Sequence, residues 1–124
     1  MPKRILIIDD DQEFCEELSE VLKNEGYAAD FCLSLEQGIH LLKTKAYGLL
    51  LLDFKMPRLS GAEFLKKYRA QLGGLKIFMI TGSLAIDQLL LKDNLSCLVT
   101  AIFNKPFEPG SLIQKIKELF SDVS

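Results

Sequence analysis

Short runs of consecutive apolar residues alternate along this chain with segments whose apolar residues recur every three or four positions. Four leucines, Leu49 to Leu52, stand next to one another, and a run of isoleucine and leucine covers residues 5–8. Such a run is typical of a strand that is buried on both faces, as in a parallel sheet. The spacing in the segments between the runs predicts amphipathic helices. The pattern predicts strands at 3–8, 28–33, 49–52, 75–80 and 98–103, and helices at 12–25, from 35 onward, at 61–71, at about 84–92 and from about 109 to 120.

Strands that alternate with helices predict an α/β fold, in which a doubly wound five-stranded parallel sheet carries five helices on its two faces. The chain has 124 residues and 48% of them are hydrophobic, which is enough to bury one core. No repeat, low-complexity tract or internal linker interrupts the pattern. We therefore expect residues 1–124 to form a single domain.

Polar residues and glycines mark the ends of the first two helices. Asp11 can cap the first helix, and Gly26 can end it. Ser34 and Gln37 have the spacing of a capping box at the start of the second helix. Gly38 inside this helix costs roughly 1 kcal/mol relative to alanine, so the second helix is expected to be less stable than the others. The inward faces are expected to carry Phe14, Leu18, Val21 and Leu22 in the first helix, and Leu35, Ile39 and Leu42 in the second.

Charge and cysteine content exclude several classes of protein. The net charge is −2, so the chain has no general basic field for direct binding of nucleic acid. The apolar runs are too short to span a membrane, and the N-terminus lacks the layout of a signal peptide. Cys15, Cys32 and Cys97 are odd in number, widely spaced and set in apolar segments. They are expected to be reduced, buried thiols of a cytoplasmic protein, and not a disulfide framework or a zinc site.

Polar residues follow the apolar runs of four predicted strands. Asp9 and Asp10 end the first strand, Asp53 the third, Thr81 the fourth and Lys105 the fifth. The carboxyl ends of parallel strands meet at one edge of the sheet, where ligands bind in open α/β folds. We therefore expect these side chains to lie together. Taken alone, Asp53 would also fit a capping or turn residue after a strand, but the other strand ends favour a functional interpretation.

Three crowded carboxylates repel one another, and a hard divalent cation among them makes the arrangement tolerable. Mg²⁺ prefers a few carboxylates with water completing an octahedron, and it favours phosphate as a further ligand. Lys105 adds a positive charge and Thr81 adds a hydroxyl donor. An ionised aspartate can accept a phosphoryl group, while the metal ion and the ammonium meet the charge on the transferring oxygens. The residues thus predict a Mg²⁺-dependent phosphoryl acceptor with Asp53 as the reactive group.

Four motifs at these strand ends resemble those of the receiver domains of bacterial two-component response regulators. The pair Asp9-Asp10 follows ILII, and DFKMPRLSG resembles the family pattern D-x-x-M-P-x-x-x-G. ITGS resembles the family's switch threonine or serine, and NKPF resembles its Lys-Pro pair. The resemblance covers essentially the whole chain. It implies the strand order 2-1-3-4-5 and a signalling domain that is no enzyme beyond catalysing its own phosphotransfer and autodephosphorylation.

The resemblance also implies a role for each acidic residue. Asp53 would be the phosphoacceptor and one of the metal ligands. Asp10 would bind Mg²⁺ directly, and Asp9 would bind it mostly through water. The backbone carbonyl of Lys55 would supply another ligand.

The remaining roles concern the phosphoryl group and the partners. Thr81 would hydrogen-bond a phosphoryl oxygen, and Lys105 would pair with the phosphoryl group. The donor would be a phosphohistidine on a sensor histidine kinase or a histidine phosphotransfer protein. The conformational change would pass to a downstream effector domain or to a homodimer, through the face of the fourth helix, fifth strand and fifth helix.

Two segments depart from the family pattern. Three residues before the lysine the family usually has an aromatic residue that swings inward, and here this position is Ile102. Phe103 is next to it but should point to the other side of the strand. The predicted fourth helix carries more leucine and isoleucine than one core-facing stripe requires, so it is either largely buried or exposes an apolar docking patch.

Two alternative functions stay open on the sequence alone. A receiver fold could serve mainly as a protein-interaction module with atypical switching, which Ile102 would fit. A haloacid-dehalogenase-like phosphatase would also use an aspartyl phosphate, Mg²⁺, a hydroxyl and a lysine. Its nucleophile would lie on the first strand, where the run from Asp9 lacks the threonine or valine of that class, and Asp53 would have no role.

Overall fold

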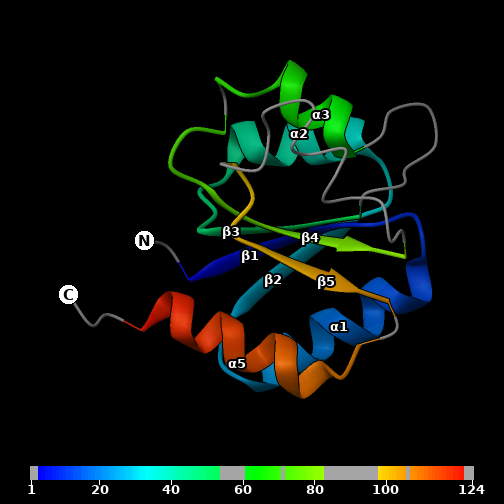
Figure 1. Cartoon of the computed structure of the whole chain (residues 1–124), viewed down its shortest axis with the longest axis vertical. Helices are drawn as coiled ribbons and strands as arrows, with labels where there is room; N and C mark the ends of the chain where they lie inside the picture. Colours follow the sequence, from blue (N-terminus) through cyan, green and yellow to red (C-terminus); the bar gives the residue numbers. More distant parts are fainter. Residues whose placement is uncertain (1–2, 54–60, 71, 83–97, 106, 122–124) are drawn as a thin grey trace.

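Five parallel strands form one sheet in the order β2-β1-β3-β4-β5, as the resemblance implied (Figure 1). The computed structural model describes residues 3–53, 61–70, 72–82, 98–105 and 107–121. Strand β2 lies at one edge of the sheet and β5 at the other. The strands are β1 (Arg4–Ile8), β2 (Ala28–Cys32), β3 (Leu49–Asp53), β4 (Lys76–Thr81) and β5 (Ala101–Asn104).

Helices cover both faces of the sheet, which gives three layers (Figure 1). Helices α1 and α5 lie on one face, and α2 and α3 lie on the other. The predicted helix at 84–92 lies outside the described residues and stays a prediction. None of the helices described is long and apolar enough to cross a membrane. The helices are α1 (Gln12–Asn24), α2 (Leu35–Thr44), α3 (Gly61–Lys67) and α5 (Pro109–Phe120).

The alternation of side chains along the central strands divides the core in two. Successive residues of a strand point to opposite faces, so an entirely apolar strand feeds both sides of the sheet. Both clusters are built largely from β1, β3 and β4, which explains why those strands carry polar residues only at their ends. The cluster under α2 and α3 holds Leu6, Ile8, Leu50, Leu52, Ile77 and Met79, and the cluster under α1 and α5 holds Ile5, Ile7, Leu49, Leu51, Phe78 and Ile80.

The parallel register aligns the carboxyl ends of the strands. Ile8 of β1 pairs with Leu52 of β3, and Asp53 pairs with Ile80 of β4. On the far side of β4, Thr81 pairs with Asn104 of β5. The residues that follow each strand therefore begin at the same edge of the sheet.

The inward face of α1 is rotated relative to the sequence prediction. Leu18 and Leu22 are buried as expected, but Cys15 is the third core position. Phe14 and Val21 are only partly buried and pack at the margin of the cluster. A helix advances about 100° per residue, so the apolar spacing fits either choice and only the packing decides. This rotation leaves an aromatic ring beside the carboxyl edge of the sheet.

The predicted ends of α1 and the predicted start of α2 are confirmed in atomic detail. The Asp11 carboxylate accepts a hydrogen bond of 3.1 Å from the amide of Phe14, and Gly26 has a φ of 95°. The Ser34 hydroxyl accepts from the amide of Gln37 at 3.2 Å. Strand β5 begins at Ala101, three residues later than predicted, and α3 ends at Lys67, four residues earlier.

Gly38 permits close packing between α2 and β1. A Cβ atom at this position would overlap Cδ1 of Ile8, lie 3.1 Å from its Cγ1 and lie 3.5 Å from the sulfur of Cys32. Both neighbours are buried, so neither has free space to move into. Glycine lowers the helix propensity at this position, but it allows a short distance between α2 and the sheet that a larger residue would prevent.

Asp30 fastens the edge strand β2 to its surroundings. Its Oδ2 atom accepts hydrogen bonds from Tyr47 Oη at 2.7 Å, Arg4 Nη1 at 3.2 Å and Lys45 Nζ at 3.4 Å. Partial burial acts to raise the pKa of the carboxyl group, but these three donors together outweigh it and lower the pKa. Folding therefore stabilises the ionised carboxylate of Asp30 relative to its protonated form.

The first prediction concerns the close approach at Gly38. We expect Gly38→Ala to lower the free energy of unfolding by about 1 kcal/mol, because overpacking outweighs the gain in helix propensity. In an Ile8→Val background, which removes Cδ1, the same substitution should be neutral or stabilising. Urea denaturation of the four proteins measures this difference. An equal effect of Gly38→Ala in both backgrounds would contradict the packing argument.

The second prediction concerns pH. Folding lowers the pKa of Asp30, so its carboxylate stabilises the folded protein at pH values above its unfolded pKa of about 4. This stabilisation is lost as the pH falls through the pKa of the folded state. Asp30→Asn should cost about 1 kcal/mol of unfolding free energy at pH 7. The gap between the two proteins should close in strongly acidic buffer, whereas the exposed Glu20→Gln should show little gap at neutral pH. A gap that stays constant with pH would refute the linkage.

Candidate functional site

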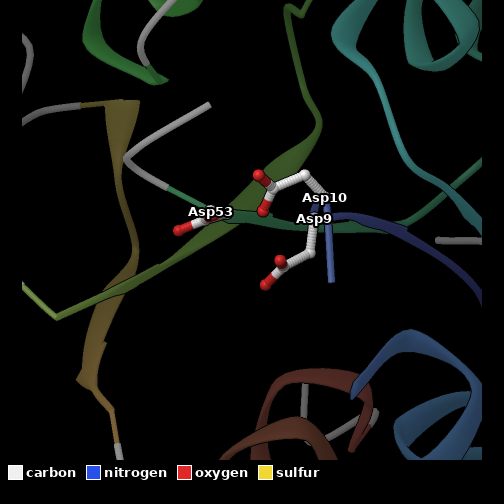
Figure 2. A group of neighbouring side chains, drawn as sticks. All are labelled: Asp9, Asp10 and Asp53. Carbon is white, nitrogen blue, oxygen red and sulfur yellow. The ribbon is translucent and has the colours of Figure 1, made fainter. Parts of the chain in front are cut away.

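Three carboxylates gather where β1 and β3 end. One oxygen from each of Asp9, Asp10 and Asp53 lies within 4.8 Å of the other two (Figure 2). Asp10 is exposed, but Asp9 and Asp53 are only 1% and 7% exposed. The sequence separates the first pair from Asp53 by more than forty residues, and the parallel pairing of β1 with β3 brings them together.

The buried carboxylate of Asp9 is bound through both of its oxygens. Lys105 Nζ lies 2.8 Å from Oδ2, and the backbone amide of Asp11 donates to Oδ1 at 3.0 Å. A charged group this deeply buried costs several kcal/mol unless it is paired and hydrogen-bonded. The Asp9–Lys105 ion pair meets this requirement and joins the end of β1 to the end of β5.

Lys105 is firmly held as a cation. Partial burial acts to lower the pKa of its ammonium group. The hydrogen bond that the ammonium donates to Asp9 and the negative charges of Asp9, Asp53 and Asp11 act in the other direction and raise the pKa overall. The side chain therefore carries a full positive charge at neutral pH, within the electrostatic reach of Asp53.

Thr81 and Lys105 are neighbours through the backbone. Thr81 is fully buried at the end of β4, and its carbonyl accepts a 2.7 Å hydrogen bond from the Lys105 amide. Asp53 pairs with Ile80, so Thr81 stands one residue beyond the paired position. The register thus brings a hydroxyl, an ammonium and a carboxylate to one short stretch of the sheet edge.

Phe14 is a site neighbour that the sequence analysis placed in the core. The ammonium of Lys105 lies over its ring, 4.6 Å from the centroid. Phe14 belongs to the first turn of α1, the helix that starts directly after the acidic residues of β1. An aromatic residue at this position is a signal that sequence reading could have used.

The cysteine next to the site is chemically inert. Cys15 is buried, and its thiol donates to the carbonyl of Asp9 at 3.4 Å. Burial, reinforced by the charge of Asp9, raises its pKa to about 12, so the thiol stays neutral. Burial also raises the pKa of Cys32 to about 11. Both cysteines are free, as expected, while Cys97 lies outside the described residues.

The donor set fits a hard divalent cation. Three carboxylates offer oxygen ligands within a span that one ion can bridge, and Asp10 is open to solvent, so water can complete the coordination. Lys105 pairs with Asp9 at the buried edge of this cluster. A magnesium ion bound among the three carboxylates would offset their mutual repulsion. Lys55, whose carbonyl the resemblance implied as a ligand, lies outside the described residues.

The sequence as a whole matches a known domain family. The family model described as the response regulator receiver domain matches residues 5–117. This chain belongs to the receiver-domain family. Receiver domains of response regulators are signalling domains of two-component systems, which agrees with the resemblance read from the sequence.

Curated relatives of this receiver domain are longer proteins. The chain is 30% identical over 117 residues to the transcriptional regulatory protein DltR of Streptococcus agalactiae, covering 92% of this chain and 50% of that protein. It is 33% identical over 119 residues to a CpxR homolog of Haemophilus influenzae, covering 94% of this chain and 49% of that protein. The chain thus spans about half the length of these relatives.

Solved structures of receiver domains superpose over nearly the whole chain. A CheY-like receiver domain from Methanospirillum hungatei is 32% identical with a TM-score of 0.83, covering 95% of this chain and 93% of that one. The response regulator protein TrrA from Thermotoga maritima, solved in complex with Mg(2+)-BeF, is 30% identical with a TM-score of 0.80, covering 95% and 99%. A two-component response regulator from Clostridium difficile is 25% identical with a TM-score of 0.87, covering 98% of both chains.

The third prediction tests the cation site. Mg²⁺ at roughly ten times its dissociation constant should raise the melting temperature by about 5 °C, because it binds only the folded protein. Asp10→Asn should abolish most of this shift by removing a ligand. Asp30→Asn, which changes an acid outside the cluster, should keep it. Thermal unfolding with and without Mg²⁺ measures the shifts, and a full shift in Asp10→Asn would place the ion elsewhere.

Proposed function

We propose that residues 1–124 act as one phosphoacceptor domain, which takes a phosphoryl group from a phosphohistidine onto Asp53. The donor is a sensor histidine kinase or a histidine phosphotransfer protein. The observation that carries the proposal is the acidic cluster of Asp9, Asp10 and Asp53 with Lys105 bound to its buried edge. Membership of the receiver-domain family and the similarity to TrrA, solved with Mg(2+)-BeF, support it.

The reaction assigned to Asp53 is a nucleophilic displacement at phosphorus. A carboxylate oxygen forms a bond to phosphorus as the bond from phosphorus to the imidazole nitrogen breaks, and the departing imidazole takes up a proton. Mg²⁺, when bound, neutralises charge on the phosphoryl oxygens. Asp10 would hold the ion directly, Asp9 would hold it through water, and the Lys55 carbonyl would add a ligand. Asp53 is buried, so little of the unmodified carboxylate is open to bulk water.

Lys105 and Thr81 contact the phosphoryl group once it is bound to Asp53. The Lys105 ammonium pairs with a phosphoryl oxygen, for which its electrostatic coupling to Asp53 makes it suitable. The Thr81 hydroxyl donates to another phosphoryl oxygen. The Lys105 amide donates a hydrogen bond to the Thr81 carbonyl, so a shift at the end of β4 is transmitted to the end of β5.

The output is a conformational change read by a further protein surface. The named relatives are transcriptional regulatory proteins of about twice this length, which supports a downstream effector domain as the recipient. A homodimer through the fourth helix, β5 and α5 is the alternative recipient. The chain itself contacts no nucleic acid and works in the cytoplasm, where the kinase domain of a sensor would meet it.

Two other functions make different predictions. A haloacid-dehalogenase-like phosphatase would turn over phosphate monoesters without Asp53, and the receiver-family match offers this alternative no support. A pure interaction module would bind its partner without becoming phosphorylated. Ile102, in place of the usual aromatic residue, is the feature that favours the second of these.

The fourth prediction separates these functions. Incubation with Mg²⁺ and a small acyl phosphate should add one phosphoryl group to the wild-type chain, as measured by intact mass. Asp53→Asn should gain none, and chelation of Mg²⁺ should suppress the gain in wild type. Asp30→Asn is the matched control and should be phosphorylated normally. Phosphorylation of Asp53→Asn would exclude the proposed acceptor, and a wild-type chain that gains nothing would favour the interaction module.

A further inference from the structure

The ammonium of Lys105 is held from two directions. The Asp9 carboxylate lies 2.8 Å away on one side, and the ring of Phe14 lies with its centroid 4.6 Å away on another. A cation over the face of an aromatic ring is attracted by the negative face of the π system, and more strongly where water is partly excluded. Lys105 is only partly exposed, so both contacts act on a half-buried charge.

The Phe14 ring is itself fixed by a row of aromatic residues. It packs edge to face on Phe107, with centroids 6.1 Å apart and planes at 86°. Phe107 packs on Phe103 of β5 at 5.8 Å, and Phe103 packs on the buried Phe78 of β4 at 5.5 Å. Such pairs restrict ring orientation beyond what apolar burial alone requires. The row therefore fixes the orientation of Phe14 relative to the buried core on the α1 and α5 face of the sheet.

Core packing alone does not account for this position. Phe14 is partly buried and borders an apolar groove of about 580 Å³ between α1 and the start of α5, which Val21 and Pro109 also line. A ring that served only the core would turn inward, as Leu18 does on the same helix. Instead Phe14 presents its ring face to Lys105.

We propose that Phe14 is a positioning residue for phosphoryl transfer, whose ring face holds the Lys105 ammonium at the acidic site. The inference rests on the proposed function. A lysine side chain has several freely rotating bonds, and a single ion pair leaves its head group free to swing about Asp9. The contact with the Phe14 ring removes this freedom before the reaction. The ammonium is therefore already in place when the phosphoryl group reaches Asp53.

The test compares substitutions that keep or remove the π face. Phe14→Leu should slow phosphorylation of Asp53 by a small acyl phosphate about three- to tenfold, in line with a cation–π contact of moderate strength. Phe14→Tyr keeps the π face and should react at the wild-type rate. Phe14→Met has a similar size without a ring and should match Phe14→Leu. The small donor removes any contribution from protein docking in the groove.

Val21→Ala provides the matched control. Val21 lines the same groove on the same helix, so its truncation tests general loss of packing and should leave the rate unchanged. Denaturation curves for each variant verify that the compared proteins are folded. Equal slowing in Phe14→Tyr and Phe14→Leu, or an unchanged rate in Phe14→Leu, would overturn the proposal.

A second measurement does not depend on phosphorylation. Protons held over the face of an aromatic ring resonate upfield, so the Lys105 methylene protons next to Nζ should be shifted upfield in wild type and in Phe14→Tyr. The shift should vanish in Phe14→Leu, with Lys105→Arg identifying the signal. Absence of the shift in wild type would refute the positioning itself. If instead the shift is present but wild type gains no phosphoryl group, the proposed function fails while the contact stands.

Discussion

Burial of the Asp9 carboxylate is the constraint on which this end of the molecule depends. A charge that is 1% exposed requires a partner, and the partner, Lys105, lies 96 positions further along the chain. The ion pair can form only if the ends of β1 and β5 meet at one edge, with β3 and β4 between them in parallel register. Fold and site therefore share one requirement, because the pairing that brings the acids together also neutralises the most buried of them.

The same requirement explains which parts of the fold could be read from the sequence. The runs ending at Ile8 and Leu52 have no polar position, so only a strand covered on both faces fits them, and the first polar residue after each marks the sheet edge. The ends of α1 could be predicted equally well, because Asp11 and Gly26 affect only the backbone within a few residues of their own position. The start of edge strand β5 was harder to predict, because its residues are only partly buried and no fully buried run marks where it begins.

Properties that depend on a distant neighbour could not be read in this way. Spacing alone fits Phe14 as well as Cys15 on the inner face of α1, because the two differ by one helical step. Gly38 looks like a weakness in a helix until Ile8 is seen to occupy the space a side chain would need. Likewise the acidic residues and Lys105 were predicted to share an edge, but which acid the lysine binds is set by burial, and burial is a property of the assembled sheet.

The two faces of β5 show how this chain differs from the family pattern. Ile102 packs with the cluster under α2 and α3, while Phe103 packs under α1 and α5. At this position the resemblance implied an aromatic residue that swings inward, whereas a β-branched side chain such as Ile102 is stiff at its first torsion. Phe103, by contrast, is joined through Phe107 to the ring that lies under the Lys105 ammonium. A movement of Lys105 would therefore disturb the aromatic packing on the α1 and α5 side of the sheet, as well as the Thr81 carbonyl to which its amide donates.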